Sequence, residues 1–423
     1  MAAFTVRSPT LEEIPTWGHF VATRGFAHRP GPVDRFTQRF VCDPSARPSH
    51  IVAAYGARAE GGAEEVVGCV RLFFRTLALC GDGSASAAVV GWGEVCSDPD
   101  LRGRGIVGLV LREAVARMER GEAREGAALP PPPPASFALL HAAPAVLSLY
   151  EKYGFVAGTL PILYGRVAVG RAGAALPAPP APLAPLLGHP LARVRPVDFD
   201  ADWAALEALR ARQAARLGLA GWTLRSEAYW RQWVRNACRG QALVLELQAA
   251  APGEGRAPAP HAPAAYGYVR WREGAWRLMD WAAAGSEGSG GEGSSGSASP
   301  ALLTDFMGVL LAAGHAFHAA AGDAGVPSPL EPALLLPGER LVVAAPLAVV
   351  RDVCGGEGAG EEVEALRDIG WMAKAPLAGA GAEAGAGGPG APSASSGASG
   401  SPLHTLQAAA ARGKFVIFNA DNI

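Results

Sequence analysis

The stretch GWGEVCSDPDLRGRGIVGLVLREAV, residues Gly91–Val115, decides how this sequence is interpreted. Within it, Gly103–Gly108 spells G-x-G-x-x-G, the glycine pattern of a dinucleotide-binding loop. That loop requires a strand running directly into the glycines and an acidic residue at the end of the next strand. Here a polar segment with a proline precedes the glycines, and the next predicted strand ends in His141. We therefore reject the dinucleotide interpretation.

The same letters from Arg102 spell R-x-x-G, a different anion-binding loop. Apolar residues recur at spacings of three and four from Ile106 to Met118, which predicts a helix beginning near Gly105. Backbone N–H groups and the helix dipole favour an anion at such a start. Gly103 and Gly105 allow close backbone approach, and Arg102 and Arg104 add positive charge. The segment predicts a pyrophosphate-binding loop.

Strands and helices are expected to alternate through the first part of the chain. Strands are predicted at residues 4–6, 50–57, 66–79, 88–95, 136–141 and 155–169, and further helices at 11–22, 33–41 and 146–153. A proline-rich stretch at 121–135 interrupts this pattern and is expected to be a disordered insert. The alternation predicts an α/β (α+β) layered fold.

A second unit is predicted at residues 191–423, after an Ala- and Pro-rich linker at 171–190. Two strands with a turn at 273–274 and a helix at 301–320 repeat the order of the first unit. Low-complexity loops are expected at 285–300 and 377–402. Because the first of these loops holds no R-x-x-G, the second copy is expected to be non-catalytic.

Composition excludes several classes of protein. The chain has 37 Lys+Arg and 39 Asp+Glu, a net charge of -2, which does not suit a nucleic-acid binder. The six cysteines show no metal-ligand spacing, so no metal is expected. The N-terminal residues lack the apolar core of a signal peptide, and no apolar run is long enough to cross a membrane. A cytoplasmic protein with reduced thiols is expected.

Two motifs resemble the GNAT superfamily of N-acetyltransferases. VCSDPDLRGRGI resembles the family's pyrophosphate loop, with Val107 in place of a small residue, and LYEKYGF at Leu149–Phe155 resembles its next motif. The resemblance covers about residues 4–169 and implies a catalytic GNAT domain at 1–170 with a mixed central sheet flanked by helices. The second unit would be a degenerate GNAT-like domain.

The resemblance also implies acetyl-CoA as the co-substrate. The pantetheine arm would then bond to one strand, and the pyrophosphate would lie on the loop. The implied contacts are Val95, Cys96 and Ser97 for the arm, and Arg102, Gly103, Arg104, Gly105, Ile106, Val107 and Gly108 for the loop.

The candidates for catalysis are one acid and three bases. Tyr150 matches the family tyrosine that protonates the leaving thiolate, a task suited to a phenol protonated at neutral pH; the alternative is a core tyrosine. Glu94 matches a strand carboxylate that deprotonates the amine, and the alternative is a structural carboxylate. His141 could also serve as a base or be a packed histidine. Cys96 is expected to line the site, because the family uses direct attack.

The third candidate base is the C-terminal carboxylate of Ile423. Multidomain proteins similar to the enhanced-intracellular-survival acetyltransferases place this group in the active site, and this chain shares their tandem layout. The predicted function is acetyl transfer from acetyl-CoA to a primary amine on a small molecule or a protein. The alternative is a catalytically inactive acyl-CoA-binding sensor or interaction protein. The acceptor and the oligomeric state stay open.

Overall fold

The computed structural model describes a chain built on two sheets. It covers residues 4–28, 31–58, 61–120, 137–158, 160, 162–169, 191–248, 261–272, 275–284, 298–321, 341–346, 366–368, 371–374 and 401–411. The predicted insert at 121–135, the linker at 171–190, most of the two low-complexity loops, and Ile423 lie outside these ranges.

The first sheet has the strand order β1-β2-β3-β4-β5-β14-β6 among the described residues. The strands are β1 (Thr5–Arg7), β2 (Ile51–Gly56), β3 (Glu65–Ala78), β4 (Ser86–Ser97), β5 (Phe137–His141), β14 (Trp371–Lys374) and β6 (Phe155–Ala157). Only the β4–β5 pair in this order is parallel.

The second sheet repeats this plan. Its strands are β8 (Ala192–Pro196), β9 (Leu243–Gln248), β10 (His261–Arg272), β11 (Ala275–Ala283), β12 (Leu341–Pro346), β7 (Ile162–Val169) and β13 (Leu366–Asp368). The β11–β12 pair is parallel, like β4–β5, and the described neighbours around it are antiparallel. The two strands predicted on either side of 273–274 are confirmed as the antiparallel pair β10 and β11.

The two sheets exchange one strand each. β7, from the first part of the chain, lies between β12 and β13 of the second sheet. β14, from the last part, lies between β5 and β6 of the first sheet. The boundary predicted at residue 170 therefore does not separate the strands of the two sheets.

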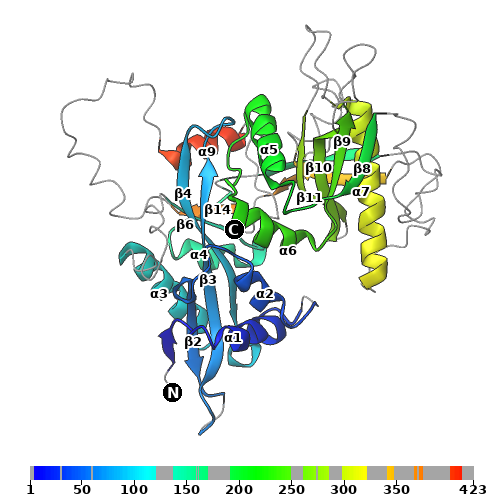
Figure 1. Cartoon of the computed structure of the whole chain (residues 1–423). Coiled ribbons are helices and arrows are strands. Elements are labelled where there is room, and N and C mark those ends of the chain that lie inside the picture. The colour runs from blue at the N-terminus through cyan, green and yellow to red at the C-terminus, as the bar shows by residue number, and fades with distance from the viewer. Residues whose placement is uncertain are drawn as a thin grey trace, which may run out of the picture.

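Helices cover both faces of the first sheet (Figure 1). Helix α3 (Ile106–Arg120) and the short α4 (Leu147–Glu151) bury apolar side chains on one face, including Val110 and Leu111. Helices α1 (Ile14–Phe20) and α2 (Arg35–Val41) cover the other face. One π-helical turn, η1 (Val21–Gly25), continues α1 and was not predicted. The predicted fold class, a mixed sheet flanked by helices, is confirmed.

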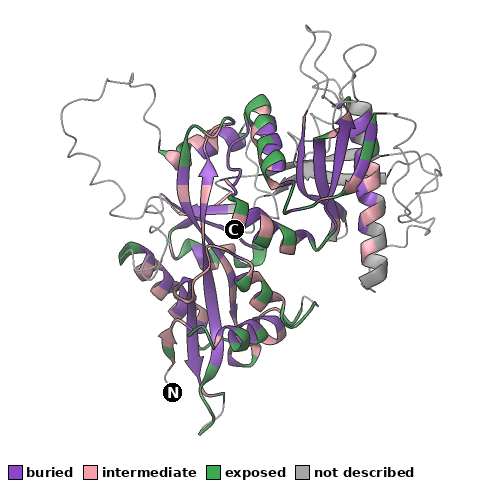
Figure 2. Cartoon of the chain, in the orientation of Figure 1, coloured by how far each residue is buried: buried purple, intermediate pink, exposed green. Residues whose placement is uncertain are grey.

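Buried aromatic side chains join the two halves. Helix α5 (Trp203–Leu217), the π-helical turn η7 (Tyr229–Val234) and α6 (Arg235–Cys238) lie near the end of β3. Both α5 and α7 (Pro300–Ala321) pack against the second sheet. Phe73 of β3 packs against Trp233, with ring centroids 6.4 Å apart. The backbone N–H of Ala78 donates to the Trp222 carbonyl at 2.9 Å. Phe73 shares one buried cluster with side chains of the second half, and Figure 2 shows buried segments in both halves.

Candidate functional site

The parallel strands β4 and β5 separate at one end. Their pairing stops at Trp92 with Leu140, whereas β4 continues to Ser97. The backbone of residues 93–97 therefore has no β5 partner on that side. Val95, Cys96 and Ser97, predicted to contact the pantetheine arm, lie on this unpaired end. An extended backbone with unpaired N–H and C=O groups can pair with an amide-containing chain.

A β-bulge bends β4 at the same point. Arg71 faces Gly93 across the β3–β4 pair, but Cys69 faces Cys96, so β4 holds one extra residue between them. Within the bulge, Glu94 has a φ of 56°, in the left-handed region. This conformation costs a non-glycine residue about 1 kcal/mol, and such strain is concentrated at functional sites.

The loop after β4 is fixed by Asp98. This residue is fully buried and begins the 3-10 turn η3 (Pro99–Leu101), accepting a hydrogen bond from the Asp100 N–H at 3.0 Å. Its carboxylate also pairs with Arg24 at 2.6 Å and Arg58 at 3.1 Å. Burial opposes ionisation, but the Arg24 hydrogen bonds lower the pKa of Asp98. The sequence signal was the Asp-Pro pair, typical of a capped turn, and its arginine partners were not predicted.

The predicted pyrophosphate loop has the geometry that an anion requires. Gly103 and Gly105 both have a φ of 78°, and a Cβ at either position would meet no atom within 4 Å. Arg102 and Arg104 are exposed and form no ion pair with any other described residue. Helix α3 begins at Ile106, so the N–H groups of its first turn have no acceptor within the helix. Two free guanidiniums and these donors fit a pyrophosphate.

The first turn of α3 carries the rest of the predicted loop. The side chain of Ile106 is buried, and Val107 is half-buried against the same core. At Gly108 the carbonyl accepts a hydrogen bond from the Tyr153 hydroxyl at 3.2 Å. This bond joins the two sequence motifs in space. Both predicted motifs therefore lie at one end of the first sheet.

Tyr150 lies beneath this end of the sheet. Its side chain is 8% exposed and packs edge-on against Phe155, with centroids 6.3 Å apart. Burial raises the pKa of Tyr150 to about 12, and the nearby Cys96 thiol acts in the same direction. No described residue accepts a hydrogen bond from the hydroxyl. A buried, protonated phenol next to the unpaired end of β4 suits proton donation.

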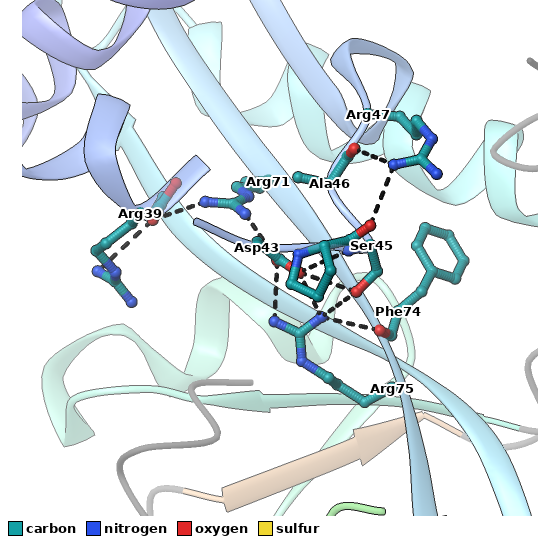
Figure 3. Close-up of polar contacts among 10 residues, drawn as sticks. Arg39, Asp43, Ser45, Ala46, Arg47, Arg71, Phe74 and Arg75 are labelled. Atoms are coloured by element: carbon teal, nitrogen blue, oxygen red, sulfur yellow. Dashed lines mark hydrogen bonds and ion pairs between the residues drawn. The ribbon is translucent and has the colours of Figure 1, made fainter. Parts of the chain in front are cut away.

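Glu94 pairs with a buried charge network, of which Figure 3 labels Arg39, Asp43, Arg71 and Arg75. Its carboxylate lies 3.7 Å from an Arg71 nitrogen and 3.6 Å from an Arg39 nitrogen. Asp43 in turn binds Arg71 at 2.8 Å and Arg75 at 3.0 Å. Neither carboxylate oxygen of Glu94 has a hydrogen bond to a described residue. These ion pairs connect Glu94 to the arginines of α2 and β3.

The other two candidate bases are His141 and the C-terminal carboxylate of Ile423. His141 is exposed at the end of β5, opposite Trp371 of β14. Ile423 lies outside the described residues, so its position is not known. Within the described ranges, no three His, Cys, Asp or Glu side chains gather as metal ligands. None of the helices in those ranges combines the length and apolar run that crossing a membrane requires.

Comparison with known proteins finds similarity only in structure. No family model matches the chain, and no curated protein matches it. A probable N-acyltransferase from Enterococcus faecalis V583 is 11% identical with a TM-score of 0.49, covering 89% of this chain and 73% of that one. A GCN5-related N-acetyltransferase from Kribbella flavida is 14% identical with a TM-score of 0.47, covering 88% and 71%. Eis1 from Mycobacterium abscessus is 13% identical with a TM-score of 0.42, covering 88% and 73%.

The TM-scores of these three structures are below 0.5, so no activity is transferred from them to this chain. The argument for an activity rests on the residues of the chain itself.

Proposed function

We propose that the chain is a GNAT acyltransferase that moves an acetyl group from acetyl-CoA to a primary amine. One observation carries the proposal: an R-x-x-G loop with two left-handed glycines opens helix α3 directly after the bulged, unpaired end of β4. This arrangement supports an anion site next to an unpaired extended backbone, within one short segment. An acyl-CoA, with a pyrophosphate and an amide-containing arm, matches both.

Each part of the co-substrate has a proposed contact. The pyrophosphate would lie on the loop from Arg102 to Gly108, where the donors of the first α3 turn and two free guanidiniums gather. The pantetheine amides would bond to the backbone of Val95, Cys96 and Ser97. This arrangement orients the thioester toward the bulge at Glu94, on the strand that carries those contacts.

The chemistry is a direct attack of the amine nitrogen on the thioester carbonyl. The C–N bond forms, the C–S bond breaks, and Tyr150 gives its proton to the departing thiolate. Its raised pKa keeps the phenol protonated at neutral pH. Glu94 or the C-terminal carboxylate of Ile423 takes the proton that the amine loses. The second half has no equivalent loop, and we assign it a supporting rather than a catalytic role.

The acceptor is an amine on a small molecule or on a protein. The near-neutral charge of the chain does not suit a nucleic acid as partner. We propose that the protein works in the cytoplasm, where acetyl-CoA is available and thiols stay reduced.

Calorimetric titration of the full-length chain with acetyl-CoA, followed by thiol release across a panel of amines, tests the proposal. We expect binding, and thiol release with at least one amine. Replacing Arg102 and Arg104 together by Ala should weaken binding about 100-fold, because each charge-assisted hydrogen bond is worth about 1.5–3 kcal/mol. The exposed Arg212 of α5, replaced by Ala, is the matched control.

The two measurements separate the possible outcomes. Absence of binding by the folded chain would rule out the proposal. Tight binding without thiol release from any amine would favour the acyl-CoA sensor instead.

A further inference from the structure

Two thiols touch each other beside the candidate site. Cys69 of β3 and Cys96 of β4 are directly opposite across the antiparallel pair, and their Sγ atoms lie 3.6 Å apart. Both residues are buried, at 0% and 6% exposure. Opposite residues of an antiparallel pair have Cα atoms about 4.5–5.5 Å apart, within the range that a disulfide spans.

The pair lies where the co-substrate is proposed to bind. Cys96 is one of the three residues on the unpaired end of β4, and its proximity helps to raise the pKa of Tyr150. Cys69 donates a hydrogen bond from its thiol to the carbonyl of Glu94 at 3.4 Å, so it supports the bulge directly. On its other side Cys96 faces Gly25, where a Cβ would come within 2.3 Å of the sulfur. The Cys96 sulfur is thus enclosed between Cys69 and the backbone of η1.

We propose that Cys69 and Cys96 form a reversible disulfide that switches off the acyl-CoA site. The effect on co-substrate binding rests on the proposed function, whereas the disulfide itself does not. To form the bond, the two sulfurs must approach from 3.6 Å to about 2.0 Å. Rotation of both side chains toward each other achieves this without a change of strand register.

The oxidant is a peroxide, small and uncharged enough to enter a buried site. The Cys96 sulfur attacks one peroxide oxygen, the O–O bond breaks, and water leaves, so Cys96 becomes a sulfenic acid. The Cys69 sulfur then attacks the Cys96 sulfur, and the S–O bond breaks. The departing hydroxide takes the Cys69 proton and leaves as a second water. Two thiols and one hydrogen peroxide give one disulfide and two waters.

The new bond would alter the bulge. Once Cys69 is bridged it has no S–H to donate, and the Glu94 carbonyl loses that hydrogen bond. The Cys96 side chain moves away from Gly25, which shifts the strand segment that carries the proposed pantetheine contacts. Contact with Cys69, together with burial, raises the pKa of Cys96 well above its usual value. A thiol held protonated reacts slowly, so the pair stays reduced until a peroxide persists.

The experiment treats the full-length chain with hydrogen peroxide, then quenches it and maps its peptides by mass spectrometry without reduction. Acetyl-CoA binding is measured before oxidation, after it, and after dithiothreitol. Cys69→Ser keeps a hydrogen-bond donor for the Glu94 carbonyl but cannot bridge. Cys42→Ala, which removes a half-buried thiol of the α2 end, is the matched control.

We expect a linked peptide containing Cys69 and Cys96, and affinity weaker by about tenfold or more, restored by dithiothreitol. The Cys42→Ala chain should respond like the wild type, and the Cys69→Ser chain should give no linked peptide and no reversible loss. Free Cys69 after excess peroxide would overturn the proposal, as would a linked chain that binds as well as the reduced one. If the reduced chain binds no acetyl-CoA, the proposed function fails, and the peptide map alone decides whether the disulfide forms.

Discussion

Gly105 shows how one backbone angle can serve binding. Its φ of 78° is unfavourable for any residue with a Cβ, although the space around it is open. Gly105→Ala should therefore destabilise the loop by about 1 kcal/mol and weaken acetyl-CoA binding about fivefold, because strain rather than a clash opposes the change. Calorimetry on the folded variant measures the loss.

Gly61 offers a control with the same backbone. It has a φ of 75°, and a Cβ there would also meet nothing, but it lies in the turn before β3. Gly61→Ala should cost a similar stability without changing the affinity. Equal affinities for the two variants would contradict the assignment of the loop.

Tyr150 can be tested separately from binding. Tyr150→Phe keeps the ring that packs on Phe155 and removes only the proton donor. We expect kcat to fall about 100-fold, a typical contribution of a general acid, with little change in acetyl-CoA affinity. In the wild type, burial raises the pKa to about 12, so kcat should not fall as pH passes the ordinary tyrosine value of 10. A pH–rate profile that declines there would argue for another acid.

Candidate site residues that are close together in the sequence could be predicted, whereas pairings between positions far apart in the sequence could not. Arg102, Gly103 and Gly105 follow a short pattern whose chemistry depends on adjacent residues. The pairing of Asp98 with Arg24 joins positions 74 residues apart, and no local pattern indicates it. No local pattern indicates the positive φ of Glu94 either, because it arises from the register of β3 against β4.

Among the elements, α2 and β3 are joined by a buried ion cluster. Burial alone would raise the pKa of Asp43, but Arg75 and Arg71 lower it to about 2 from 3.8. Because the folded pKa is depressed, Asp43 adds stability above pH 3.8 that is lost as pH falls toward 2, about 2 kcal/mol in total. Denaturant unfolding of the wild type across that window should show the decline.

Asp43→Asn removes the charge that the two arginines share. It should cost about 3 kcal/mol at neutral pH, because the buried Arg75 loses the carboxylate it pairs with and Arg71 keeps only the more distant Glu94, and it should flatten the acid-induced decline. Asp34→Asn, at the exposed start of α2 where the side chain makes no capping hydrogen bond, is the control and should change neither quantity appreciably. An unchanged pH dependence in the Asp43→Asn chain would assign the decline to other carboxylates.

Long helices and strands can be predicted from their hydrophobic patterns, whereas short irregular segments depend on the residues that pack against them. The apolar run of β3 and the three-and-four spacing of α3 predicted both elements to within a few residues. The π-helical turn η1 was missed, because its last residue, Gly25, is fixed by the contact with Cys96 of β4. Tertiary packing decides such segments, and the local sequence does not encode it.

At the scale of the whole molecule, the exchange of β7 and β14 was not predictable. Either strand is a short apolar run that suits either sheet, and the choice depends on how the halves pack. The similar plan of the two sheets explains why the exchange is possible, since β14 takes in the first sheet the place that β7 takes in the second. Met372 of β14 is fully buried in the core under α3 and α4.

The exchange makes the first sheet depend on the end of the chain. Without β14, β5 and β6 would face each other with no strand between them. Met372→Ala in the full chain should therefore cost about 2–5 kcal/mol, the usual range for a buried methionine. Val156→Ala, at an exposed position on the adjacent β6, should cost much less.

A fragment of residues 1–170 tests the same dependence directly. It contains every proposed contact for the co-substrate but lacks β14, so we expect it to show no cooperative unfolding and no acetyl-CoA binding. The full chain should instead unfold in a single transition by calorimetry, because each half completes the sheet of the other. A folded fragment that binds acetyl-CoA would show that the exchanged strand is dispensable. Failure of the fragment alone, with binding by the full chain, would make β14 a necessary part of the half that carries the proposed co-substrate site.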